Sequence, residues 1–164
     1  MRPGVRILFV GINPGVRSAI TGHHFAGFSN RFWKLLFRSG LVLEPVTYLD
    51  DDRLPEWRYG ITNVVTRATR GIDELRPEEY AAGRARLRGK VQRYKPEIVA
   101  FVGITVYRAL FPELKGPVTI GLQQQRLGES RVFVLPNTSG RNAHYSFDAM
   151  LAAFTSLRKH SERA

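Results

Sequence analysis

Three short apolar runs are spaced along the chain, and turn-forming or small polar residues follow each of them. The runs are Val5–Val10, Ile98–Val102 and Arg131–Leu135. A nearly continuous apolar run of this length is typical of a strand that is covered on both faces of a sheet. The segment Ile61–Val65 fits either a short strand or an extended loop, and its pattern does not decide between them.

Three further segments carry apolar residues at helical spacing, and each begins at a residue that caps or starts helices. Pro77 suits a first helical position, and Gly40 suits the left-handed residue that ends a helix. The predicted helices run from Ser29 or Asn30 to Gly40, from Pro77 to Pro96, and from Ser146 through Leu157.

Strand and helix signals alternate along the chain, without internal repeats or low-complexity segments. This alternation predicts an α/β domain with a mostly parallel sheet. The chain has 164 residues, of which 43% are hydrophobic. That is enough apolar material for one well-buried domain and too little for two, so we expect a single domain over residues 1–164.

The composition excludes several kinds of protein. No apolar stretch approaches the roughly 18 to 20 residues of a membrane-spanning helix, and the N-terminus lacks a secretory signal pattern. We therefore expect a cytoplasmic, nucleoid-associated protein without a membrane partner. The absence of cysteine excludes disulfides, thiolate metal sites and thiol nucleophiles. The four histidines lack a second ligand at metal-site spacing, so we expect no metal.

The chain is strongly basic, with 25 Lys and Arg against 14 Asp and Glu and a formal net charge of +11. Its sequence pI is about 10.7. Such a charge favours a polyanionic partner such as nucleic acid. The alternative is an arginine-rich surface that is scattered and merely solvated, and composition does not separate the two.

Two polar loops follow predicted strands. Gly11–Phe28 comes after the first strand, and Pro136–Tyr145 comes after the last. In open α/β sheets, ligands bind beyond the carboxyl ends of the strands. Both loops are rich in small polar residues, which let backbone approach a ligand and present N–H donors. We expect the functional site to lie in these loops.

Four sequence blocks occur in order along nearly the whole chain: GINPG, GHHFAGFSNRFWKLLFRSGL, GITNVV and LPNTSGRNAHYS. Together they resemble the mismatch-directed uracil/thymine DNA glycosylases of the uracil-DNA glycosylase superfamily. The resemblance implies a three-layer α/β/α domain around a short, mostly parallel four-stranded sheet. It also implies a monomeric, monofunctional enzyme without metal or organic cofactor. Such an enzyme flips uracil, thymine or a related pyrimidine out of a G·U or G·T mispair in double-stranded DNA and hydrolyses its N-glycosidic bond.

The resemblance assigns two residues of the first loop to the attacking water. Asn13 matches the residue that holds and polarises this water, and because an amide is a weak base, catalysis must rely on positioning. His24 would orient the water or contact a backbone phosphate, and a solvent-exposed loop histidine fits equally well. From the residues alone, Asn13 before Pro14 also fits a turn.

Other residues of the same loop match contacts to the flipped base. Gly15 stands where uracil-specific relatives place a tyrosine, so it would leave room for the methyl group of thymine. Phe25 matches the aromatic residue that stacks on the base, with core packing as the alternative. Ile12 would offer main-chain groups to the pyrimidine. Asn30 would recognise the base edge or cap its helix.

The second loop matches the wedge that fills the gap left by a flipped base. Gly140, Arg141 and Asn142 are the matching residues, with Arg141 as the inserted side chain and the loop backbone reading the opposite guanine. The residues around Arg141 depart from the two wedge patterns usual in the family, and a phosphate contact is the alternative for this arginine. The candidates for contacts to the DNA backbone are Arg17 and Ser139, with Lys34, Arg67, Arg70 and Arg126 in or near candidate loops.

Rival functions are less well supported by the sequence. A catalytically weak or inactive mismatch-binding protein on the same fold would share nearly all of these residues. A phosphate-binding loop would need a glycine pattern or a lysine that GINPG lacks. A serine hydrolase would need a nucleophile elbow that is absent, and Asp50–Asp52 is interpreted as a charge cluster in a loop.

Overall fold

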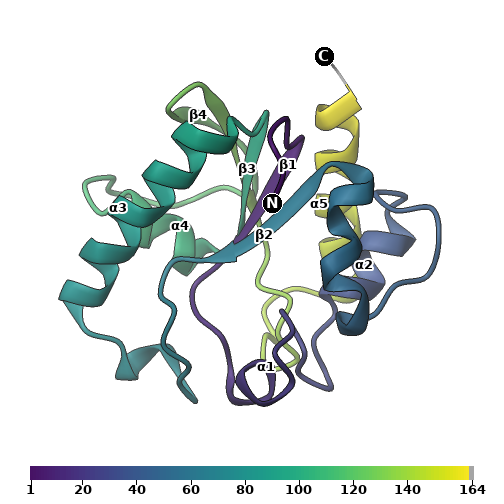
Figure 1. The fold of residues 1–164 in the computed structure, drawn as a ribbon, viewed down its shortest axis with the longest axis horizontal. Coiled ribbons are helices and arrows are strands. Elements are labelled where there is room, and N and C mark those ends of the chain that lie inside the picture. The colour runs from purple at the N-terminus through teal and green to yellow at the C-terminus, as the bar shows by residue number, and fades with distance from the viewer. Residues whose placement is uncertain (163–164) are drawn as a thin grey trace.

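The computed structural model describes residues 1–162, so the last two residues of the expected domain 1–164 lie outside the described part. Its centre is a five-stranded sheet (Figure 1). The strand order is β2 (Tyr59–Asn63), β1 (Ile7–Gly11), β3 (Ile98–Val102), β5 (Ser130–Leu135) and β4 (Gly121–Leu127). All neighbours are parallel except β4, which pairs antiparallel with β5 at one edge.

The predicted count of four strands is wrong by one, because β4 carries no apolar run. Its sequence GLQQQRL alternates between half-buried and exposed positions, as suits an edge strand with only one covered side. The undecided segment at 61–65 belongs largely to β2. Pairing continues beyond this strand, since the Val64 N–H donates to the Gly11 carbonyl at 2.9 Å.

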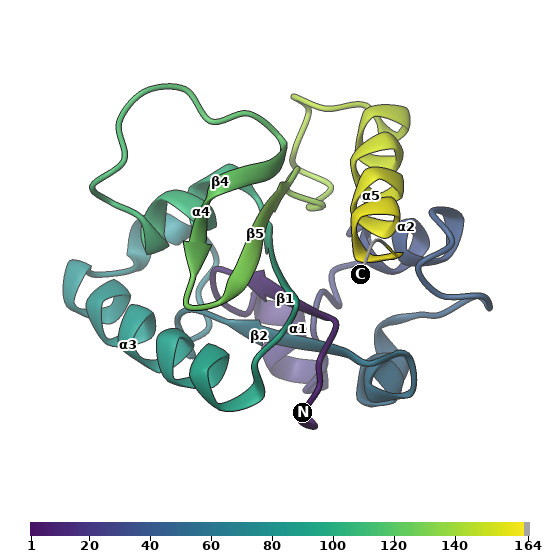
Figure 2. The ribbon, with the colours of Figure 1, turned by 90° about the horizontal axis from the view of Figure 1, so that it is seen from above.

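Helices cover both faces of the sheet, which confirms the three-layer arrangement (Figures 1 and 2). One face is covered by α3 (Pro77–Tyr94) and α4 (Ile104–Leu110), the other by α2 (Phe32–Arg38) and α5 (Phe147–Glu162). Alternate residues of each central strand enter the two cores. In β1, Ile7 and Phe9 pack with α2 and α5, whereas Leu8 and Val10 pack against α3 and α4.

The three predicted helices are confirmed as α2, α3 and α5. Asn30 lies one residue before the N-cap of α2, Arg31, and its Oδ1 accepts a hydrogen bond from the Phe32 N–H at 3.0 Å. The Ser146 hydroxyl accepts from the Ala149 N–H at 3.1 Å at the start of α5. Gly40 has a φ of 82°, the left-handed conformation expected at the end of α2.

Four connecting elements lie outside the predictions. They are the short helix α1 (Val16–Thr21), α4, and two 3₁₀ helices, η1 (Tyr48–Trp57) and η2 (Ile72–Glu74). The helix α1 buries none of its residues, so its sequence has no apolar stripe from which a helix could be predicted. Among the described residues, no helix is both long enough and apolar enough to cross a membrane.

Candidate functional site

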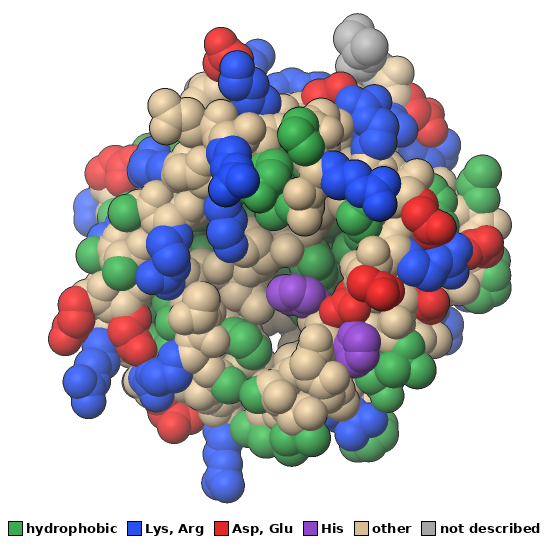
Figure 3. Space-filling view, in the orientation of Figure 1, with side chains coloured by type: hydrophobic (Ala, Val, Ile, Leu, Met, Phe, Trp, Pro, Cys, Tyr) green, Lys and Arg blue, Asp and Glu red, His purple; other side chains and the backbone are tan. Residues whose placement is uncertain are grey.

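A cavity of about 720 Å³ opens at the carboxyl ends of the four parallel strands. Gly11, Asn63, Val102 and Asn137 line it, and each stands at or just beyond the end of one of these strands. Figure 3 shows the hollow on one face of the molecule, with histidine side chains beside it. The cavity therefore lies where the topology of a parallel sheet leaves the connecting loops free to bind a ligand.

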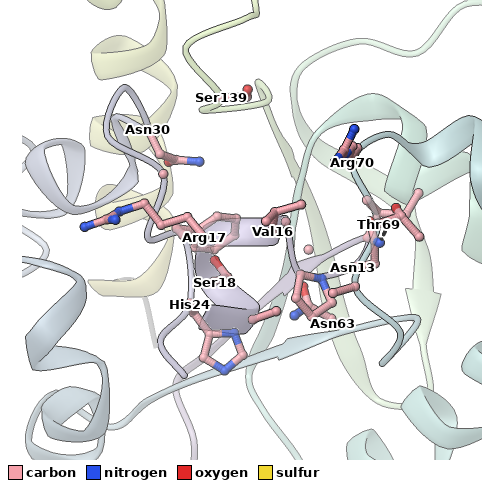
Figure 4. Close-up of a pocket in the computed structure, with 18 of the residues that line it drawn as sticks. Asn13, Val16, Arg17, Ser18, His24, Asn30, Asn63, Thr69, Arg70 and Ser139 are labelled. Atoms are coloured by element: carbon pink, nitrogen blue, oxygen red, sulfur yellow. Dashed lines mark hydrogen bonds between the residues drawn. The ribbon is translucent and has the colours of Figure 1, made fainter. Parts of the chain in front are cut away.

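Hydrogen bonds fix the orientation of the Asn13 amide. Its Nδ2 donates to the Arg67 carbonyl at 3.0 Å and to the Thr69 hydroxyl at 2.8 Å. The Thr69 hydroxyl gives its own hydrogen to the Gly71 carbonyl at 2.8 Å, so toward Asn13 it can only accept. Both amide hydrogens are thus committed. The Asn13 Oδ1 accepts no hydrogen bond from a described residue and is a free acceptor at the cavity (Figure 4).

The two adjacent histidines are anchored by an aspartate. Asp51 accepts a hydrogen bond from the His24 N–H at 2.9 Å, and its other oxygen lies 2.8 Å from the His23 Nδ1. Burial lowers the pKa of His24, with Lys90 and His23 acting in the same direction and Asp51 opposing them. The lowered pKa favours the neutral imidazole at pH 7, and His24 is a half-buried residue of the cavity wall.

Phe25 and Asn30 both line the cavity and also make contacts within the protein. The Phe25 ring packs on Phe32, with centroids 4.4 Å apart, and also lines the cavity. The Asn30 Oδ1 accepts hydrogen bonds from the Phe32 N–H at 3.0 Å and from the Thr138 hydroxyl at 2.9 Å. Its amide NH₂ makes no hydrogen bond to a described residue and remains a donor for a ligand. Figure 4 shows Asn30 on the side of the cavity across from Asn13.

Gly15 has free space beside it, whereas Ile12 is packed and hydrogen-bonded within the protein. A Cβ at Gly15 would meet no atom within 4 Å, so there is space beside this glycine at the start of α1. Ile12 packs against the core under α3 and α4, and its carbonyl accepts from the Val65 N–H at 2.8 Å. The Ile12 carbonyl is thus committed to the backbone pairing between the two strand ends.

The predicted wedge loop is clamped to the segment before α2. A Cβ at Gly140 would overlap the Ser29 side chain and lie 3.0 Å from the Ser29 carbonyl oxygen, so only glycine allows this close approach. The Arg31 guanidinium donates to the carbonyls of Ser139 at 2.7 Å and Asn142 at 3.1 Å. The segment before α2 and the predicted wedge loop are therefore held together by direct contacts.

Asn142 is engaged within the wedge loop. Its Nδ2 donates to the Asn137 carbonyl at 2.8 Å, and its Oδ1 accepts from the His144 N–H at 2.9 Å. Its own N–H donates to the Ser139 carbonyl at 3.0 Å. These bonds leave the exposed Arg141 side chain, which also lines the cavity, as the free group at the tip of the loop.

Positive charge dominates the cavity. Arg17, Arg70 and Arg141 line it, and no aspartate, glutamate or lysine does so among the described residues. Arg17 also braces the first loop, because its Nε donates to the Ala26 carbonyl at 2.9 Å. The cavity is therefore suited to an anionic ligand or to negative charge that develops during a reaction. No group of three or more possible metal ligands occurs among the described residues.

The other basic candidates lie in different surroundings. Arg67 is exposed but paired with Glu79, whose carboxylate lies 2.7 Å from the Arg67 Nε. The expectation for Arg126 is wrong, because this residue pairs with Arg131 at the start of β5 and thus lies at the end of the sheet away from the cavity. Lys34 is exposed on α2 and lies outside this cavity.

Sequence reasoning missed three residues that shape the site: Asn63, Asp51 and Arg31. The Asn63 side chain crosses the end of β1, where its Oδ1 would lie 2.6 Å from a Cβ at Gly11, so that a glycine is needed there. A polar residue at the end of the strand beside β1 could have indicated Asn63. The contacts of Asp51 and Arg31 join segments far apart in the sequence, so no local pattern could have indicated them.

The fold and the cavity define an α/β protein whose ligand site lies at the ends of parallel strands. Residues 1–158 match the model of the uracil DNA glycosylase superfamily, and the chain belongs to this superfamily. Over 147 residues, the chain is 40% identical to the G/U mismatch-specific uracil DNA glycosylase of Schizosaccharomyces pombe. That match covers 85% of this chain and 45% of the relative, so the chain spans less than half of the relative's length.

Proposed function

We propose that the protein is a monofunctional DNA glycosylase that excises uracil from G·U mispairs in double-stranded DNA and leaves an abasic site. The superfamily membership and the activity for which the S. pombe relative is named support this function. The observation that carries it is the Asn13 amide, whose hydrogens are committed and whose oxygen is a free acceptor in the cavity. We further propose that residues 1–164 act as one monomeric domain.

The chemistry needs a positioned water rather than a strong base. The water oxygen forms a bond to C1′ of the sugar, and the C1′–N1 bond breaks with its electron pair going to the pyrimidine. Asn13 Oδ1 would accept one hydrogen of this water and aim its lone pair at C1′. The water loses its proton to solvent as the bond forms, because an amide is too weak a base to keep it.

The remaining groups hold the base and stabilise its departure. Phe25 offers a ring for stacking, and the Asn30 NH₂ can donate to a pyrimidine carbonyl. The pyrimidine leaves as an anion, which the arginines around the cavity stabilise. A neutral His24 can exchange hydrogen bonds with the water or the base without bringing a charge of its own.

The lining of the cavity also favours hydrolysis over a covalent route. A covalent sugar intermediate needs an amine or another activated nucleophile. No lysine lines the cavity among the described residues, and the sequence contains no cysteine. Water is therefore the nucleophile in this proposal, and the product is an abasic site with an intact DNA backbone.

Two further aspects of specificity belong to the proposal. The open space at Gly15 would admit the methyl group of thymine, so that G·T mispairs are substrates as well. Arg141 would enter the gap left by the flipped base, with the clamped loop backbone meeting the opposite guanine. Both G·U and G·T mispairs also unpair at lower cost than matched pairs, which adds selectivity.

An excision assay on labelled duplexes tests the proposal. Purified protein is incubated with duplexes that contain G·U, G·T, A·U or G·C, and alkali then cleaves any abasic site. We expect strand scission at G·U and G·T, with G·U preferred over A·U. Mismatch-dependent gel retardation without scission would contradict the enzyme and favour a mismatch-binding protein.

The variant Gly15→Tyr tests the pocket for thymine in the same assay. A tyrosine would occupy the space beside the pyrimidine ring, so we expect loss of G·T scission with G·U scission retained. Gly89→Ala is the matched control, since a Cβ at this α3 position also meets no atom within 4 Å. Equal loss on both substrates would contradict the assigned role of Gly15.

A further inference from the structure

A second cavity, of about 400 Å³, adjoins the first. Residues 25–28 and 30, three side chains of α2 and residues 45–48 form its walls. Arg17, Phe25, Gly27 and Asn30 line both cavities, so the two share a wall. We refer to the second cavity as the aromatic groove, because its lining includes the aromatic side chains Phe25, Phe28, Trp33, Phe37 and Tyr48.

Phe28 is a highly exposed aromatic residue of this groove. Its side chain is 89% exposed, yet the Arg17 guanidinium stacks on its ring, 3.7 Å from the centroid. Arg17 is itself held by the Ala26 carbonyl and by the Tyr48 hydroxyl, to which it donates at 2.9 Å and 3.3 Å. The exposed ring is thus held against a fixed partner, which lowers the entropy lost when another planar group stacks on it.

The positive charges of the groove are complementary to the negative phosphates of a nucleotide. Arg17 and Lys34 line it, and no aspartate or glutamate does so among the described residues. Aromatic faces beside cations are the combination that binds single-stranded nucleic acid, because bases stack on the rings and phosphates pair with the cations. A cationic ligand would find no carboxylate in this lining.

We propose that the aromatic groove binds the base of a nucleotide that neighbours the excised pyrimidine on the same strand, when this neighbour is unpaired. Phe28 is the stacking surface, and Arg17 and Lys34 face the phosphates. The shared wall at Phe25 and Asn30 puts the groove within reach of a strand that leaves the first cavity. The inference rests on the proposed function and extends the substrate class to uracil in single-stranded or frayed DNA.

Binding to a single-stranded oligonucleotide with a central tetrahydrofuran abasic analogue tests the groove. We expect Phe28→Ala to weaken this binding about 5- to 150-fold, the range for loss of one stacked base. Phe28→Tyr keeps the ring and should bind as the parent protein does. Leu43→Ala is the matched control, because Leu43 is 87% exposed and lies outside the groove. We expect no change for this control.

A fluorescent base reports the stacking directly. With 2-aminopurine beside the abasic analogue, binding of the parent protein should quench the fluorescence, and Phe28→Ala should abolish the quenching. Unchanged affinity and quenching in Phe28→Ala would overturn the proposal. Equal losses in Phe28→Ala and Leu43→Ala, or equal losses on single strands and matched duplexes, would overturn it as well.

The same protein preparations separate this inference from the proposed function. Excision from a G·U duplex by the parent protein is measured alongside the binding. If excision occurs and Phe28→Ala still binds the single strand normally, the nucleotide-binding role of the groove is refuted. The proposed glycosylase function is then retained. If excision is absent, the proposed function fails, and the quenching experiment still decides whether the groove binds an unpaired base.

Discussion

Replacing Asn13 by aspartate should lower the free energy of unfolding by an amount that depends on pH. Asn13 Nδ2 donates to the Arg67 carbonyl at 3.0 Å and to the Thr69 hydroxyl at 2.8 Å. In Asn13→Asp, a carboxylate oxygen would face these two acceptors instead of a donor. The neutral, protonated carboxyl is therefore favoured, and the pKa of this carboxyl should rise above its usual range.

The size of the effect follows from the two lost hydrogen bonds. Each neutral hydrogen bond contributes about 0.5–1.5 kcal/mol, so losing both costs about 1–3 kcal/mol. For a chain of this length, each kcal/mol shifts the melting temperature by about 2–4 °C, which gives a decrease of about 2–12 °C. Protonation restores one donor. The penalty should thus be smaller at low pH and should grow as pH rises through the raised folded-state pKa.

Thermal unfolding of Asn13→Asp and Asn13→Ala at about pH 5 and about pH 8 measures this linkage. The alanine variant loses the same hydrogen bonds but has no group that titrates, so it corrects for the pH dependence of the rest of the protein. We expect the aspartate variant to lose stability relative to the alanine variant as the pH is raised. A constant difference between the two variants would refute the assigned orientation of the Asn13 amide.

Three further changes test the elements around the site. Gly140→Ala brings a Cβ into the Ser29 side chain and should lower the excision rate on duplexes more than the rate on single strands. The control Gly89→Ala has open space around its Cβ and should leave both rates unchanged. Arg31→Met removes two charge-assisted hydrogen bonds to the wedge loop, each of which contributes about 1.5–3 kcal/mol. The free energy of unfolding should therefore fall by about 3–6 kcal/mol in a denaturant titration, with weaker preference for G·U over A·U. Ser146→Ala removes the cap of α5 and should cost about 1 kcal/mol in the same titration, with no change in base preference.

The sequence predicted those parts of the fold that bury continuous or periodic apolar residues. The strand Ile98–Val102 has the predicted bounds, and α3 begins at Pro77 as predicted, because burial on both faces or a helical stripe leaves a strong pattern. The edge strand β4 and the helix α1 bury little, so their residues were free to be polar. The sheet therefore has five strands rather than the four expected.

Only those site residues that lie together in one loop could be predicted from the sequence. Asn13 and Phe25 lie in the first loop, whose position after a buried strand and whose resemblance to a family both point to a binding site. The hydrogen bonds that orient Asn13 come from residues 67–69, and the clamp on the wedge loop comes from Arg31. Such contacts between distant segments depend on tertiary packing, and no spacing in the sequence reveals them.

The most direct test of the central claim is the single-turnover rate of uracil excision from a G·U duplex by Asn13→Ala, measured together with the affinity for the same duplex. If Asn13 Oδ1 aims the attacking water, the rate should fall by about 100-fold or more while the affinity stays near that of the parent protein. Excision at the parental rate in Asn13→Ala would contradict the account.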